Sequence, residues 1–465
     1  MPLTSPEYFV FLVIVYFAYW LSARARLAGF FVVLAANAYF YARWSPVYLA
    51  LIPAAASADF LLARAMEGEV RGAARRAWVS LSVAMNVGLI ASAKYLPLFA
   101  GWAARPGGGG WAAWTLPLGL SFYGFQAMTY TIDVYRRDAK AATSYLAYLC
   151  SVSFFPTALA GPITRVAALM PQWERTGRTV TAEEGGRALF WIGLGLMKKF
   201  LIADYLGEHL VNRIFDLPKL YSGFEALMGV YGYAFQLYYD FSGYTDIALG
   251  SALLLGVKLP PNFNRPYTAE NIADFWRRWH ISLSNWLRDY LFFSLPGKRS
   301  RYMPYVNLIV TFAIGGIWHG ARWTFGIWGL MHGAGLALTR GWQAWRGKRK
   351  PSPNAALRAA RIVATFHFVA FAWIFFRAGS VETAGDILAQ IFSGTWGAAN
   401  ISGGFRLVFA IAVVAHYWPK GWYQGALGLY CRAPFYAQAA ALALLALAIR
   451  YVAATGAAPF VYQRF

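Results

Sequence analysis

The chain has 465 residues, of which 59% are hydrophobic and only 13% are charged, and its mean hydropathy is +0.42. Soluble domains carry about 25% charged residues, so this composition excludes an ordinary soluble protein. The formal net charge of +22 does not indicate nucleic-acid binding, because no recognised nucleic-acid module accompanies it. We expect the basic residues to lie in short cytoplasmic loops instead.

Long apolar runs recur along the whole chain. Read with a window of about 20 residues, they predict about eleven or twelve membrane-spanning or re-entrant helices. The runs lack the alternation of a membrane barrel, so the predicted fold is an all-α polytopic membrane protein. Thirteen candidate segments, a few of which we expect to be re-entrant or interfacial, begin near residues 7, 28, 47, 77, 116, 145, 188, 223, 304, 323, 362, 405 and 434.

Loop charges predict the orientation of these helices. Basic loops tend to stay in the cytoplasm, and the basic loops here are 24–26, 63–76, 135–140 and 346–361. The segment 378–405 contains no Lys or Arg but carries Glu382 and Asp386, so we expect it outside. Alternation then places both the N-terminus and the C-terminal tail, 456–465, outside the cytoplasm.

The segment 262–297 is unusual because it is rich in both tryptophan and arginine. From Phe275 onward its apolar residues recur at helical spacing, which predicts a helix lying at the cytoplasmic membrane interface. His280 lies one turn from Trp276 and is therefore expected to point inward. The alternative interpretation is an interfacial helix whose buried histidine simply bonds a carbonyl group. The predicted apolar stripe comprises Trp276, Trp279, Leu283, Trp286, Leu287 and Tyr290.

His319 ends a strongly apolar run, VNLIVTFAIGGIW, and Gly320 follows it. An ionisable side chain is costly in hydrocarbon unless it lines a cavity or pairs. A neutral imidazole there can accept a proton from a hydroxyl group, which is general-base chemistry. The alternative is a packing histidine. Arg322 would share its face if the helix continued, whereas His332 would lie about 220° around one continuous helix and is expected to be structural or supporting.

The remaining histidines and both cysteines suggest no chemistry. His209, His367 and His416 are isolated, and Cys150 and Cys431 have neither metal-ligand spacing nor a disulfide framework. No HExxH motif and no phosphate-binding loop are present, so we expect neither a metal nor ATP-driven chemistry.

Three sequence blocks together resemble the membrane-bound O-acyltransferase (MBOAT) family, in its bacterial alginate O-acetyltransferase membrane-subunit branch. The blocks are LAGPITR (159–165), QLYYDFSGYTDIALG (236–250) with NFNRPYTAENIADFWRRWHISLSNWLRDYLF (262–292), and GGIWHGARWTFGIWGLMHG (315–333). The resemblance implies one membrane domain over 1–465, with an acyl tunnel open to acyl-CoA from the cytoplasm and to an acceptor from outside.

The resemblance also implies roles for individual residues. The essential histidine of the family matches His319, within the catalytic helices 304–340, and the second histidine matches His280. His319 would accept the proton of the acceptor hydroxyl while the oxygen attacks the acetyl thioester, and His280 would orient the site or polarise the thioester carbonyl. On charge alone, and not from the resemblance, we expect the phosphates of coenzyme A to be attracted by Arg277, Arg278, Arg288 and Lys298. The candidate substrate-binding residues are Arg277, Arg278, Trp286, Arg288, Asp289, Trp318 and Arg322.

The C-terminal tail ends in PFVYQRF, which is similar to an aromatic ending seen in this branch. The resemblance implies that Tyr462 receives the acetyl group and passes it to an SGNH-type polysaccharide acetyltransferase outside the bacterial inner membrane. The alternative is that Tyr462 anchors the tail at the membrane interface.

Other functions stay open at this stage. Within the family, the acyl group could be D-alanine, and the acceptor could be peptidoglycan or cellulose. A transporter that uses both histidines as a proton relay is a different class, but no internal repeat supports it. A glycosyltransferase is least favoured, because Asp240 and Asp246 match its acidic motif poorly.

Overall fold

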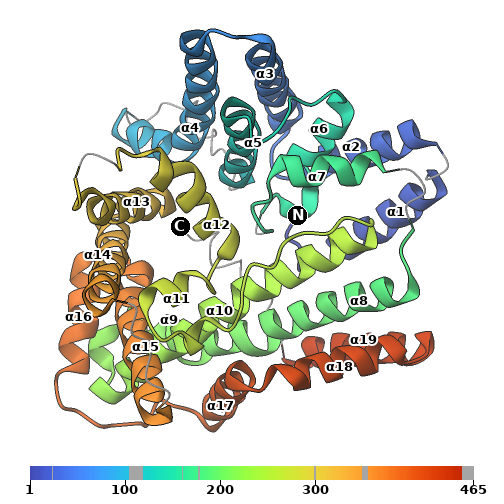
Figure 1. Ribbon diagram of the computed structural model, residues 1–465. Coiled ribbons are helices and arrows are strands. Elements are labelled where there is room, and N and C mark those ends of the chain that lie inside the picture. Colours follow the sequence, from blue (N-terminus) through green and yellow to red (C-terminus); the bar gives the residue numbers. More distant parts are fainter. Residues whose placement is uncertain are drawn as a thin grey trace. The chain divides into compact units, whose positions relative to one another are not determined.

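The computed structural model describes residues 1–22, 25–103, 119–159, 161–175, 179–297, 300–347 and 354–452 (Figure 1). Within these ranges the chain forms helices and no strands, so the all-α prediction is confirmed. The chain divides into two compact units, which are described separately. The first comprises residues 1–192 and 244–260, and the second comprises residues 193–243 and 261–465.

In the first unit, α3, α4 and α5 pack together and form the group at the top of Figure 1. Asp59 of α3 is fully buried, and its carboxylate accepts hydrogen bonds from Ser82 (2.6 Å) and Asn86 (2.9 Å) of α4. The last turns of α10 join this unit, where the Tyr8 hydroxyl donates to Ser251 at 2.9 Å. The helices are α1 (Pro6–Ser22), α2 (Arg26–Ala42), α3 (Tyr48–Gly68), α4 (Gly72–Ala103), α5 (Gly119–Arg136), α6 (Tyr145–Val152), α7 (Val166–Glu174), α8 (Ala182–Met197) and α10 (Gly223–Leu254).

The second unit begins with the end of α8, continues into two π-helical turns and contains the helices that carry the candidate site. The π-helical turns are η2 (Lys198–Asp204) and η3 (Gly207–Val211). Two short elements precede α10, namely α9 (Asn212–Asp216) and the 3₁₀ turn η4 (Pro218–Leu220). Two more follow it, namely the 3₁₀ turn η5 (Pro266–Thr268) and α11 (Ile272–Trp276). The remaining elements are α12 (Ile281–Trp286), η6 (Leu287–Leu291), η7 (Phe292–Ser294), α13 (Met303–His319), α14 (Trp323–Arg346), α15 (Ala355–Arg377), α16 (Val381–Ile391), α17 (Gly403–Tyr417), α18 (Lys420–Arg432) and α19 (Phe435–Val452).

The helices α13 and α14 form a tightly packed antiparallel hairpin. A Cβ atom added at Gly316 would lie 3.1 Å from the Cα atom of Gly329, and one added at Gly333 would lie 2.7 Å from the Cα atom of Ile309. No larger side chain fits at these crossings without separating the two backbones. The glycines of the GGIWHG and WGLMHG motifs therefore set the distance between the two helices.

A buried ion-pair cluster joins η2 to α10. The Lys199 ammonium lies 2.7 Å from Asp204 and 2.8 Å from Asp240, and Lys199 and Asp240 are fully buried. The Lys199 ammonium is thus paired with both carboxylates. A buried charge without an opposite partner would be strongly destabilising.

Most predicted apolar segments coincide with helices, but not all of these helices are long enough to cross a membrane. By length and composition, three described helices qualify as spans: α3, α15 and α19. Three shorter apolar helices are α1, α2 and α17. The prediction of a span from residue 145 is wrong, because α6 contains only eight residues, about 12 Å of helix against a hydrocarbon core of about 30 Å.

The prediction of one continuous helix from Phe275 is also wrong. The α-helix stops at Trp276 and resumes at Ile281, and His280 between them has φ +40°. Left-handed backbone interrupts a right-handed helix, although the apolar spacing runs across the break without a change.

Candidate functional site

His319 is the last residue of α13, and its ring lies among aromatic side chains. The ring centroid is 4.6 Å from Trp318, 5.1 Å from Trp328 and 4.9 Å from Phe376. The residue is only 5% exposed. The apolar run and α13 thus end at the same place, and three elements (α13, α14 and α15) supply the surroundings of His319.

Arg322 does not continue the helix of His319. The chain turns after His319, and Arg322 directly precedes α14. Its guanidinium lies 5.5 Å from the centroid of the Phe325 ring and donates to the Ala378 carbonyl at 3.5 Å. The expectation that these side chains share one helical face fails because Gly320 ends α13.

His332 is closer to His319 than one continuous helix would place it. Because the hairpin folds back, the Trp328 ring lies 5.1 Å from the His319 ring and 5.0 Å from the His332 ring. The Trp276 indole donates to Nδ1 of His332 at 3.2 Å. An indole N–H can only donate, so Nδ1 is the bare nitrogen of a neutral His332 ring and the proton is on Nε2.

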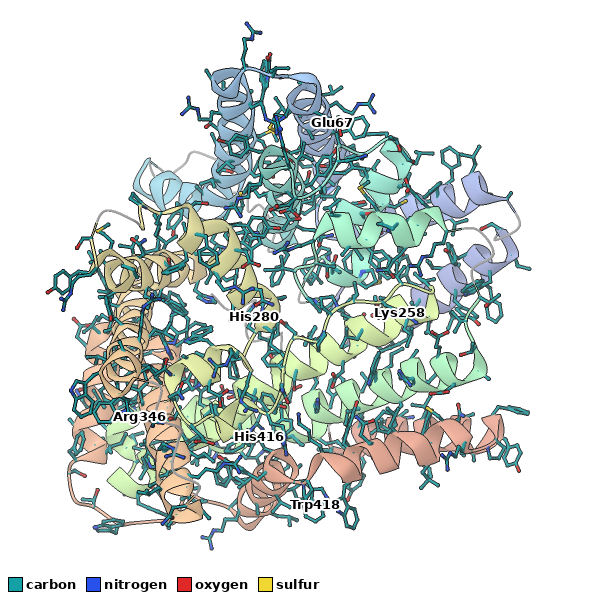
Figure 2. All side chains as sticks on the ribbon, in the orientation of Figure 1. Glu67, Lys258, His280, Arg346, His416 and Trp418 are labelled. Atoms are coloured by element: carbon teal, nitrogen blue, oxygen red, sulfur yellow. The ribbon has the colours of Figure 1, made fainter. Side chains whose placement is uncertain are left out.

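His280 lies between α11 and α12 (Figure 2) and is 1% exposed. The expectation that it points inward is confirmed. Its ring meets the Phe241 ring edge to face at 4.6 Å, and its Nδ1 lies 3.2 Å from Asn262 Oδ1. Burial lowers the pKa of His280, since a charged imidazole would lose its hydration. The ring is therefore neutral at neutral pH.

Buried indoles connect the surroundings of the two predicted catalytic histidines. Trp279, which precedes His280, lies 5.1 Å from the Trp373 ring, and Trp373 stacks at 5.8 Å on Trp328, the neighbour of His319. The second unit thus brings both histidines to one aromatic cluster.

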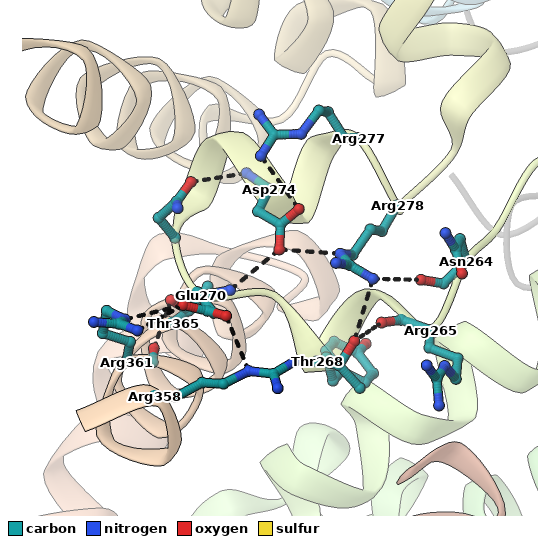
Figure 3. A network of polar contacts seen from close by, with 12 residues as sticks. Asn264, Arg265, Thr268, Glu270, Asp274, Arg277, Arg278, Arg358, Arg361 and Thr365 are labelled. Atoms are coloured by element: carbon teal, nitrogen blue, oxygen red, sulfur yellow. Dashed lines mark hydrogen bonds and ion pairs between the residues drawn. The ribbon is translucent and has the colours of Figure 1, made fainter. Parts of the chain in front are cut away.

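The predicted donor-binding arginines belong to a polar network at the start of α11 (Figure 3). Arg277 and Arg278 pair with Asp274 at 3.2 and 3.0 Å. Arg358 and Arg361 of α15 pair with Glu270 at 3.0 and 2.8 Å. Four arginines thus surround two carboxylates, which leaves a positive surplus that suits a polyanionic ligand.

The other predicted binding residues lie in the same unit with different neighbours. Arg288 pairs with the adjacent Asp289 at 2.7 Å, and Trp286 contacts the Tyr290 ring at 5.5 Å. Trp318 packs against His319. Lys298 and Tyr462, with the tail 456–465, lie outside the described residues.

Sequence reasoning missed Asn262 and the contribution of α15. Asn262 is 1% exposed and contacts His280 from 18 positions earlier in the chain. The basic loop 346–361 contributes Arg358 and Arg361 to the network beside Asp274, and no spacing rule detects a contact between segments so far apart in the chain. Within the described ranges, no group of three or more His, Cys, Asp or Glu residues could hold a metal ion.

The described residues form an all-helical protein with several apolar helices, and comparison with known families gives its class. The sequence profile of the MBOAT, or membrane-bound O-acyltransferase, family matches residues 123–381, and the chain belongs to this family. Both histidines and the whole α13–α14 hairpin fall inside the match.

Three relatives show the range of activities in this family. A probable alginate O-acetylase from Azotobacter vinelandii is 36% identical over 85% of this chain and 78% of its own length. A peptidoglycan O-acetyltransferase from Helicobacter pylori is 36% identical over 76% of this chain and 72% of its own length. A teichoic acid D-alanyltransferase from Bacillus subtilis is 31% identical over 56% of this chain and 68% of its own length. The chain is therefore a membrane O-acyltransferase.

Proposed function

We propose that the protein transfers an acetyl group from cytoplasmic acetyl-CoA across the bacterial inner membrane, for O-acetylation of an extracytoplasmic polysaccharide of the alginate type. The observation that carries this proposal is the burial of His319 at the end of α13, among the aromatic side chains of three helices. The alginate O-acetylase relatives, which cover most of the chain, support the choice of acetyl group and polymer.

In the proposed reaction, His319 accepts the proton of the acceptor hydroxyl while the hydroxyl oxygen attacks the carbonyl carbon of the acetyl thioester. The C–S bond then breaks, and His319 returns the proton to the departing thiolate. The positive surplus formed by Arg277, Arg278, Arg358 and Arg361 attracts the phosphates of coenzyme A to the cytoplasmic end of the acyl tunnel. In this proposal the Tyr462 phenol is that acceptor hydroxyl, and its acetyl ester is then transferred to an SGNH-type partner outside, which frees the phenol again.

The second candidate is D-alanyl transfer from a carrier protein, which the 31% identical teichoic acid D-alanyltransferase relative supports. Peptidoglycan is the alternative acceptor, supported by the Helicobacter pylori relative. The family match supports acyl transfer in general over a transporter or a glycosyltransferase.

The test uses the purified full chain in nanodiscs with radiolabelled acetyl-CoA. We expect the wild type to consume the thioester and His319→Ala to abolish consumption. The matched control is His367→Ala, because His367 is an exposed histidine of α15 whose ring bonds Tyr231 and the backbone of its own helix. If the wild type neither binds nor consumes acetyl-CoA, the donor is wrong and a carrier-linked acyl group becomes the first candidate.

A further inference from the structure

The two nitrogens of His280 have different surroundings. Nδ1 lies 3.2 Å from Asn262 Oδ1, whereas Nε2 is buried and has no hydrogen-bond partner among the described residues. A buried polar atom without a partner is a place where a ligand atom can bind. Nε2 of His332 and Nδ1 of His416 also lack a partner among the described residues, but of these three histidines His280 alone has a left-handed backbone. Which nitrogen carries the proton therefore decides what kind of ligand atom His280 can receive.

Asn262 decides the position of that proton. The backbone N–H of Ser282 lies 3.1 Å from the same Oδ1 atom, and the Ser282 hydroxyl lies 2.9 Å from it. A backbone N–H can only donate, so the atom that it meets must be the amide oxygen and not the amide nitrogen. An oxygen in this place accepts hydrogen bonds, so Nδ1 of His280 must carry the proton.

The backbone holds this arrangement in place. The Ile281 N–H donates to the Asn262 carbonyl, and the Asn264 N–H donates to the Arg278 carbonyl, both at 2.9 Å. His280 itself has φ +40°, a conformation that non-glycine residues adopt at a cost of about 1–3 kcal/mol and often at functional sites. These two backbone hydrogen bonds hold His280 in a strained conformation. A histidine that only filled space would not need this conformation.

We propose that Asn262 is a positioning residue that keeps His280 in its Nδ1–H form, so that the bare Nε2 accepts a hydrogen bond from a hydroxyl group of the acceptor. This inference rests on the proposed function, because it assumes an alcohol as the acceptor. It assigns His280 to orienting the hydroxyl, since polarising a thioester carbonyl would require an N–H group at Nε2.

His332 provides an internal comparison. Its Nδ1 accepts from the Trp276 indole, so its proton is on Nε2, the reverse of His280. His416 has the form expected for His280, because the Tyr267 backbone N–H donates to its Nε2 at 3.1 Å. The same chain therefore holds buried histidines of both forms, and a single spectrum can contain them.

The first measurement is ¹⁵N NMR of the full chain in nanodiscs with labelled histidine, since protonated and bare ring nitrogens resonate far apart. Spectra of His280→Gln and His332→Gln assign the signals among the six histidines. We expect a bare Nε2 for His280 and a bare Nδ1 for His332. A protonated Nε2 on His280 in the wild type would overturn the inference.

The second measurement is the pH dependence of kcat/KM. In the wild type, the side chains that contact the His280 ring or its partner Asn262 are Phe241, Asn262 and Ser282, and none of them changes charge with pH. Asn262→Asp keeps the acceptor oxygen and adds a negative charge beside the ring. An adjacent carboxylate raises the pKa of an imidazole, so protonation of His280 should reduce kcat/KM at a higher pH in Asn262→Asp than in the wild type. An acid limb that stays in place would show that His280 does not contact the reacting group.

Asn262→Leu removes the acceptor oxygen, and we expect kcat/KM to fall by about 100-fold or more. The matched control is Asn264→Leu, because Asn264 is exposed and its backbone N–H and carbonyl make its hydrogen bonds to Arg278.

The NMR result separates this inference from the proposed function. If the wild type transfers no acyl group but His280 has the expected form, the proposed function is wrong, the part of the inference that concerns the acceptor fails with it, and the Nδ1–H form set by Asn262 stands. If the wild type is active but Nε2 of His280 carries the proton, the proposed function stands and the positioning role is wrong.

Discussion

Gly329 offers a direct test of how helix spacing controls the site. A Cβ atom at position 329 would lie 3.1 Å from the Gly316 Cα atom and 3.2 Å from the Phe312 carbonyl carbon, and it would clash with the Phe312 carbonyl oxygen. Atoms in ordinary contact are about 3.5 Å apart, so Gly329→Ala must separate α13 and α14 by about 1 Å. Overpacking of this kind costs about 1–3 kcal/mol.

The same separation moves His319 relative to Trp328, whose rings are now 5.1 Å apart. A displacement of about 1 Å can reduce a catalysed rate by about 100-fold. We therefore expect Gly329→Ala to lower both the unfolding temperature and the acyl-transfer rate of the folded protein, measured in the same nanodisc preparation.

Gly326→Ala is the matched control, because Gly326 lies on the same helix and a Cβ atom added there has no neighbour within 4 Å. We expect no loss of activity and a gain in stability of about 0.5–1 kcal/mol. If Gly329→Ala behaved like Gly326→Ala in both measurements, the glycines would not set the geometry of the site.

Three further outcomes can be checked. Lys199→Met leaves Asp204 and Asp240 buried without their lysine and should lower the free energy of unfolding by about 3–5 kcal/mol. The control is Lys219→Met, at the exposed pair with Asp386, which should lower it by no more than about 1 kcal/mol. Equal shifts in the melting temperature of the two variants would contradict this. Burial lowers the pKa of His280 from 6.5 to about 3, so its contribution to stability is complete above pH 6.5 and is lost as the pH falls toward 3. His280→Gln should therefore flatten the fall of melting temperature with acidification, and an unchanged slope would refute the assignment. Tyr462→Phe should abolish polymer acetylation in cells while expression stays normal, and unchanged acetylation would exclude the relay.

The sequence was sufficient for features that depend on local periodicity. Apolar runs located most of the helices. His280 is buried as expected, although the helical spacing from Trp276 behind that expectation is interrupted in the structure.

Features that depend on backbone conformation or distant contacts were not predictable from one sequence. The break at His280 leaves the apolar spacing intact, so periodicity gives no sign of it. Asn262 reaches His280 through the fold and not through a helical repeat. The hairpin that brings His332 near Trp328 needs a turn after His319, whereas the helical-wheel argument assumed a straight helix.

The π-helical turn η2 has a consequence for insertions and deletions in this part of the chain. Lys199 and Asp204 are five positions apart, a spacing that matches the π-helical repeat and that an α-helix would place on different faces. Each residue of an α-helix turns the following side chains by about 100°. Deleting one residue between them would leave a spacing of four, which an α-helix also places on one face, so the Lys199–Asp204 pair can survive the deletion. The side chains after Asp204 would then turn by about 100° relative to those before Lys199. Length, as well as residue type, should be strictly limited between Lys198 and Asp204.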